Sequence, residues 1–113
     1  MGALQRRAQI NSNEILELGP FVIDREKYSL SKSGQEIKLP RKEFELLFLL
    51  GRNQGKVVKR DTIFQNIWGK DVIVVDRTID VHIRRLRKKI GEHFIQTIKG
   101  VGYKFSVPQE ANH

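Results

Sequence analysis

The feature that most constrains the fold of this chain is a change in the spacing of its apolar residues at Pro40. Between Ile15 and Lys38, apolar and polar residues alternate in short runs, as they do in β-strands. After Pro40, apolar residues recur every three or four positions, as on one face of an α-helix. Beyond Phe94 the alternation returns. The sequence therefore predicts an α+β fold in which strands, helices and strands follow one another.

The first part of the chain predicts a small antiparallel meander. Turn-forming residues divide residues 15–38 into short runs, and they stand at Gly19-Pro20, at residues 24–27 and at Ser33-Gly34. Short alternating runs separated by such turns are typical of neighbouring antiparallel strands.

Two helices are expected between residues 40 and 68. Pro40 suits the first turn of a helix because its missing N–H costs nothing there, and the wide apolar face that follows predicts a heavily buried helix ending at residues 53–55. Asp61 is the expected N-cap of a second, shorter helix that runs to about Trp68. Between the two helices, Val57-Val58 is too short to predict more than one strand-like turn.

A third helix is expected from Asp76 to a stop at Gly91. Its apolar residues form one stripe, made of Ile79, Ile83, Leu86 and Ile90. Two alternating segments, residues 94–98 and 103–107, then flank a tight loop at residues 99–102 and predict a hairpin. Two short helices, a longer basic helix and a hairpin, in this order, describe a winged helix-turn-helix.

The charge of the third helix indicates its partner. The chain carries 21 Lys and Arg against 13 Asp and Glu, a net charge of +8. Residues 77–89 hold six of the basic residues and one acid, Asp80, and therefore account for +5 of that charge. Asp80 and Arg84 are spaced for an ion pair within the helix, but one acid cannot neutralise six bases. A helix with a buried stripe and a cationic opposite side fits the major groove of duplex DNA.

Position along this helix assigns candidate roles. Recognition helices usually contact bases with their N-terminal half, so base contacts are expected from Thr78, Val81, His82 and Arg85. Phosphate contacts are expected from Arg77, Arg84, Arg87 and Lys88. One alternative is open, because Asp76 and Asp80 share a side of the helix with Arg87, which would then brace the helix instead of contacting DNA.

Two further candidate sites lie outside the third helix. Lys99 and Gly100 stand in the glycine-rich hairpin loop, and a cationic loop of this kind can enter the minor groove of DNA. The alternative is that the glycines serve the turn alone. Trp68 is expected to anchor the end of the second helix in the core, with a phosphate contact through its indole N–H as the alternative.

Other classes of function fit the sequence less well. The chain has no cysteine, and its three histidines lack the spacing of a metal site, so neither a metal nor another cofactor is expected. No nucleophile–base pair favours an enzyme. An RNA-binding module would favour exposed aromatic residues, but most aromatic residues here occupy core-type positions. A pure protein-interaction domain that uses residues 72–75 would leave the cationic helix unexplained.

The location of the chain is expected to be the cytoplasm. The longest apolar run, residues 46–50, is far too short to cross a membrane. The first 13 residues contain no apolar stretch of the kind found in secretory signals.

Four segments together resemble the DNA-binding effector domain of OmpR/PhoB-family response regulators, and they are residues 39–50, 55–69, 76–90 and 95–105. The resemblance extends from the meander to the hairpin. It implies a four-stranded N-terminal antiparallel sheet, a three-helix core and a C-terminal hairpin wing. It also implies that the DNA contacts come from the helix and wing residues named above. The domain is expected to span residues 14–107, after a linker at residues 1–13 and before a tail at residues 108–113.

The resemblance also implies partners. Such regulators belong to two-component systems and bind direct DNA repeats, usually as head-to-tail dimers, and the isolated domain is expected to be a monomer. They carry an N-terminal receiver domain with a phosphoacceptor aspartate, which residues 1–13 cannot supply. In activating members, one loop contacts RNA polymerase, and it corresponds here to Gly69, Lys70, Asp71, Val72, Ile73, Val74 and Val75.

Overall fold

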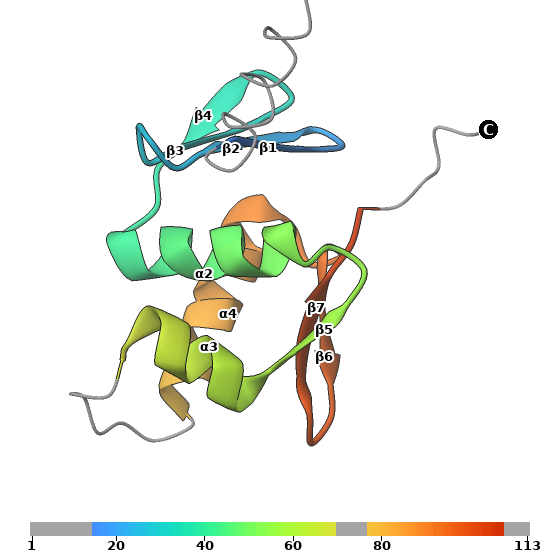
Figure 1. Ribbon diagram of the computed structural model, residues 1–113. Helices are drawn as coiled ribbons and strands as arrows, with labels where there is room; N and C mark the ends of the chain where they lie inside the picture. The colour runs from blue at the N-terminus through green and yellow to red at the C-terminus, as the bar shows by residue number, and fades with distance from the viewer. Residues whose placement is uncertain (1–14, 70–76, 108–113) are drawn as a thin grey trace, which may run out of the picture.

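A four-stranded sheet, three helices and a three-stranded sheet form the structure, a computed structural model that describes residues 15–69 and 77–107. The four-stranded sheet lies across one side of the helices, and the three-stranded sheet stands beside them (Figure 1). The predicted α+β class and the winged helix-turn-helix are therefore confirmed. Within the described residues, no helix is both long and apolar enough to cross a membrane.

The N-terminal sheet consists of β1 (Ile15–Leu18), β2 (Phe21–Asp24), β3 (Ser29–Lys32) and β4 (Gln35–Ile37). The strands pair antiparallel in chain order, as the meander predicts. Side chains alternate between the two faces of a strand, so Phe21 and Ile23 are fully buried while Val22 between them is exposed. The buried face lies against the helices and contributes to a single core.

The helices are α2 (Arg41–Arg52), α3 (Arg60–Ile67) and α4 (Arg77–Ile90). The first begins directly after Pro40, as expected. The prediction of Asp61 as the N-cap of α3 is wrong, because Lys59 occupies that position and Asp61 lies inside the first turn. The extended backbone of Lys59 belongs to a strand, and the helix starts directly after it, two residues earlier than an Asp61 cap would place it. The negative charge of Asp61 is still favourable near the helix N-terminus.

The second sheet contains a strand that the sequence did not predict. In addition to β6 (Ile95–Ile98) and β7 (Gly102–Phe105), it includes β5 (Val57–Lys59) in the order β5-β7-β6. The segment 57–59 pairs with β7, which follows it by more than 40 residues in the sequence. A strand this short is stable only because of that distant partner, so local spacing gave no signal for it.

The apolar stripe of α4 is buried as predicted. Its four members are at most 2% exposed, and they are Ile79, Ile83, Leu86 and Ile90. Gly91 ends the helix with a φ of +119°, a conformation that side chains disfavour, and its N–H donates to the carbonyl of Arg87 at 2.9 Å. The Nζ of Lys32 donates to the carbonyl of Ile90 at 2.9 Å and places a positive charge at the negative end of the helix dipole.

One basic residue of α4, Lys89, pairs with a buried acid. Glu43 of α2 is 1% exposed, and its Oε1 accepts a hydrogen bond from the Nζ of Lys89 at 3.1 Å. A buried carboxylate needs such a partner because leaving water is costly for a charge. Lys89 therefore serves the fold and is not part of the outward cationic side.

We expect Lys89→Ala to lower the free energy of unfolding by about 1–3 kcal/mol, because the Glu43 carboxylate would remain buried without its partner. Lys88→Ala is the matched control: it removes an exposed lysine at the neighbouring position and should change stability by less than about 0.5 kcal/mol. Urea denaturation of both variants measures the difference. Equal losses would contradict the structural role of Lys89.

Candidate nucleic-acid interface

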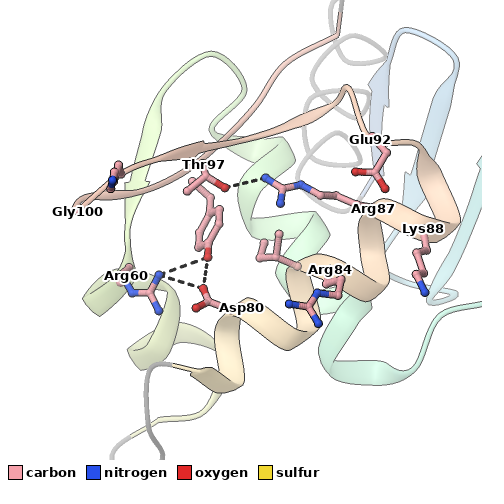
Figure 2. A pocket seen from close by; sticks show the side chains of 11 residues that line it. Arg60, Asp80, Arg84, Arg87, Lys88, Glu92, Thr97 and Gly100 are labelled. Atoms are coloured by element: carbon pink, nitrogen blue, oxygen red, sulfur yellow. Dashed lines mark hydrogen bonds and ion pairs between the residues drawn. The ribbon is translucent and has the colours of Figure 1, made fainter.

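A groove of about 570 Å³ separates α4 from the wing formed by β6, β7 and the loop between them. Below, this space is called the α4–wing groove. Its basic lining residues outnumber its acidic ones, Asp80 and Glu92, and they are Arg60, Arg84, Arg87, Lys88 and Lys99. Figure 2 shows side chains from α3, α4 and the wing converging around this space. An open, mainly cationic groove suits a polyanion. Among the described residues, no group of His, Asp and Glu is suited to hold a metal ion.

The outward side of α4 presents three exposed basic side chains, those of Arg84, Arg85 and Lys88. They lie on the side of the helix away from the buried stripe, as the sequence predicts. Val81 and His82 are half-buried. Arg77 and Thr78 form the start of α4, but the contacts predicted for their side chains fall outside what the structure describes.

Arg87 is held by the wing. Its Nε and Nη2 donate to the carbonyl of Ile95 at 3.1 and 2.9 Å, and Nη2 also donates to the Oγ1 of Thr97 at 2.8 Å. Figure 2 shows the side chain reaching from α4 toward Thr97. The structure thus favours a bracing role in which the brace is to β6, and the predicted partner Asp76 lies outside the described residues. A DNA contact by Arg87 stays a prediction.

Trp68 anchors the end of α3. Its ring stacks on Phe64, with 6.0 Å between ring centroids, and packs against the core. His82 of α4 meets Trp68 edge-on at 5.1 Å, so the tryptophan also joins α3 to α4. Lys42 of α2 lies over the same ring at 5.9 Å and donates to the carbonyl of Ile67 at 2.7 Å. These contacts favour the anchoring role expected for Trp68.

Asp80, in the first turn of α4, bonds to two other elements. Its Oδ1 accepts hydrogen bonds from the hydroxyl of Tyr103 on β7 and from Nη1 of Arg60 on α3, the latter at 3.1 Å. The same Arg60 nitrogen donates to the Tyr103 hydroxyl at 3.3 Å (Figure 2). We call these three residues the Asp80 cluster. Arg84, which the sequence spacing would allow to pair with Asp80, acts on that carboxylate through its nearby charge.

The Asp80 cluster shifts the ionisation of its members. The hydrogen bond from Tyr103 and then the contacts with Arg60 lower the pKa of Asp80, although partial burial opposes this. Burial, and next the hydrogen bond to Asp80, raise the pKa of Tyr103. Burial alone would lower the pKa of Arg60, but its bonds to Asp80 and Tyr103 raise it. At neutral pH the cluster therefore joins a carboxylate, a guanidinium and a neutral phenol.

The two glycines of the wing loop region have different roles. Gly100 is exposed beside Lys99 and has a φ of +78°, so it serves the turn. Gly102 is buried in β7, where a Cβ would lie 2.0 Å from the carbonyl oxygen of Val58. Gly102 therefore allows β5 and β7 to approach each other. The alternative that the glycines serve only the turn is incomplete.

Sequence reasoning missed Arg60, Tyr103 and Thr97, which join the α4–wing groove from α3 and the wing. The alternating pattern around Tyr103 predicted a strand but gave no partner for its hydroxyl. Of the predicted polymerase-contact loop, the structure describes only Gly69, with residues 70–75 outside the described part.

Comparison with known proteins identifies similar chains. The family described as "Transcriptional regulatory protein, C terminal" matches residues 34–105. The heme response regulator HssR of Staphylococcus haemolyticus is 43% identical over 106 residues, covering 90% of this chain and 47% of that protein. The chain thus spans about half the length of the curated relative that it matches.

Solved structures that resemble this chain also come from response regulators or their DNA-binding domains. Response regulator DrrB of Thermotoga maritima, described as an OmpR/PhoB homolog, superimposes with a TM-score of 0.78 at 34% identity, over 92% of this chain and 49% of that one. The DNA-binding domain of RstA from Klebsiella pneumoniae, solved in complex with the RstA box, gives a TM-score of 0.74 at 28% identity, over 82% of this chain and 97% of that one.

We expect the Asp80 carboxyl to titrate below its ordinary pKa of 3.8 and to move upward, toward that value, in Tyr103→Phe, which removes the hydrogen bond. Since the folded-state pKa is lowered, the stability that the cluster contributes is present above pH 3.8 and is lost as pH falls through the folded-state value. Carbon-13 NMR titration of both proteins measures the midpoints. Identical midpoints would contradict the hydrogen bond.

Proposed function

The chain belongs to the OmpR/PhoB family of C-terminal DNA-binding domains of response regulators, and from this membership we propose that α4 enters the major groove of DNA while the wing reaches the minor groove. As a member of this family, the domain binds DNA and regulates transcription. The contacts that achieve this, and the partners of the whole protein, are proposed below.

The observation that carries the proposal is the separation of charges on α4. Lys89 pairs with buried Glu43, and Arg87 is bound to the wing. Among the α4 side chains that the structure describes, Arg84, Arg85 and Lys88 stand exposed on the outward side, and the exposed Lys99 stands at the tip of the wing. Both elements that would meet DNA therefore carry exposed cations.

The exposed residues differ in the contacts they can make. Arg85 lies near the middle of α4, where its guanidinium can donate two hydrogen bonds to the O6 and N7 of guanine. Val81 can meet a thymine methyl, and Thr78 and His82 complete the base-contacting set. Phosphate contacts are assigned to Arg77, Arg84 and Lys88. Arg87 is assigned one as well, through an N–H group other than those that bond to the wing. At the wing, Lys99 and Gly100 approach the minor groove. An indole contact from Trp68 to phosphate is the weakest of these assignments, because the ring is packed between helices.

The full-length protein is proposed to be larger than this domain. The chain covers about half of its curated relatives, which are response regulators, so we assign residues 14–107 to the effector domain and expect a receiver domain upstream. On direct DNA repeats two copies would bind head to tail, and residues 69–75 would contact RNA polymerase. A protein that binds the chromosome in this way acts in the cytoplasm.

Selection of bound sites from random DNA duplexes tests the proposed function. We expect enrichment of a motif repeated in tandem, with copies spaced by about one helical turn, roughly 10 base pairs. A structured RNA used as competitor should not displace the selected duplex. Failure to enrich any motif would contradict sequence-specific binding, whereas efficient competition by RNA would favour an RNA-binding domain.

We expect Arg85→Ala to weaken binding to the selected site by about 1–3 kcal/mol and to relax discrimination at one base pair, because a bidentate contact to guanine would be lost. Arg52→Ala is the matched control, since it removes an exposed arginine from α2 and should leave discrimination unchanged. Fluorescence anisotropy with the selected duplex and its single-base variants measures both effects. Equal weakening on all sequences would exclude base contact by Arg85.

A further inference from the structure

We propose that the Asp80 cluster is a positioning device that holds α4 and the wing at a fixed separation, so that both engage DNA at once. The inference rests on the proposed function, because it concerns how the two DNA-contacting elements act together. Tyr103 and Asp80 are positioning residues in this scheme, and they act through Lys99 and the exposed cations of α4.

Apolar packing does not fill all of the space between the two elements. The main packing partners of α4 are α2 and α3, not the wing strands. A groove of about 570 Å³ lies between α4 and the wing instead. Ile95, Tyr103 and Phe105 anchor the wing strands in the core that they share with α4, and the polar groups that cross the groove fix the separation of its walls beyond that core.

The groove is crossed at two points along the helix. Asp80 in the first turn of α4 bonds to Tyr103 of β7, and Arg87 in the last turn bonds to Thr97 of β6 (Figure 2). Arg87 also bonds to the carbonyl of Ile95 on the same strand. Seven residues of α-helix correspond to about 10 Å, so the two attachments are well separated. A wing tied at one point could pivot about it, whereas two ties fix its orientation to the helix.

The Asp80 cluster also includes Arg60, the first residue of α3. Arg60 bonds to both Asp80 and Tyr103, and its backbone N–H donates to the carbonyl of Val101 in the wing loop at 3.1 Å. The wing loop, α3 and α4 thus meet around one carboxylate. Loss of that carboxylate's hydrogen bonds would loosen the wing relative to both helices.

The charge of Asp80 makes the proposal distinguishable from a simple electrostatic effect. A carboxylate that lines a cationic groove lowers the positive potential that attracts DNA phosphates. On charge alone, Asp80→Asn should strengthen binding to every sequence. Positioning predicts the opposite for the specific site, where α4 and the wing must both fit.

The first experiment uses Tyr103→Phe, with Tyr28→Phe as a matched control. Each substitution removes one hydroxyl that donates to a carboxylate, but Tyr28 bonds to Glu45 beneath the N-terminal sheet. The effect of Lys99→Ala on binding to the selected duplex is measured in wild type and in both backgrounds, over a range of salt concentrations. A change in how strongly Lys99 contributes is a readout that lower stability alone would not produce.

In wild type and in Tyr28→Phe, we expect Lys99→Ala to weaken binding severalfold and to reduce the salt slope by about one. In Tyr103→Phe, the fold-change caused by Lys99→Ala should be less than about half as large, because a loosened wing engages DNA less often. An equal effect of Lys99→Ala in all three backgrounds would overturn the positioning role.

Asp80→Asn supplies the second measurement and does not depend on how well Tyr103→Phe folds. We expect affinity for the selected duplex to fall about threefold to tenfold, while affinity for a scrambled duplex stays equal or rises. A rise on both duplexes would overturn the proposal. If Lys99→Ala and Arg85→Ala have no effect even in wild type, the proposed DNA contacts fail instead, and circular dichroism confirms that each variant is folded.

Discussion

The burial of one aliphatic stripe decides where every charge of α4 points. Ile79, Ile83, Leu86 and Ile90 are sealed in the core against α2, α3 and the sheets, and burying side chains of this size is the main favourable term in folding such a small domain. A rotation of the helix that exposed this stripe would be far costlier than any single surface contact. The orientation of Arg84, Arg85 and Lys88 toward solvent is therefore a consequence of the core.

Some basic residues of α4 bond to other elements of the fold, and others project from its outward side. Lys89 offsets the cost of a buried carboxylate, and Arg87 ties the helix to β6. Composition and spacing place all of them on one helix but do not separate these two groups. The division narrows the cationic surface to a few side chains, and the basic α4–wing groove lies next to it.

Local sequence patterns predicted much of the fold. Most features that they failed to predict depend on contacts between residues that are distant in the sequence. Periodicity predicted the meander, the helices and the hairpin because each pattern is complete within its own segment. It missed β5, whose partner is β7, and it paired Asp80 with Arg84 on the same helix when the fold brings Arg60 and Tyr103 to it. The buried apolar stripe of α4 made it possible to predict which cations of that helix are exposed. It gave no indication that side chains of α3 and the wing would line the groove beside them.

The pairing of β5 with β7 limits where the wing can change. Gly102 pairs with Ile98 across the hairpin and lies against the carbonyl of Val58, so no side chain fits at this position. The strand that follows the loop is thus paired with β5 on one side and with β6 on the other, while residues 99–101 lie in the loop beyond the paired residues. Changes in the sequence of the wing are therefore confined to residues 99–101, which can be replaced without disturbing the sheet that carries them.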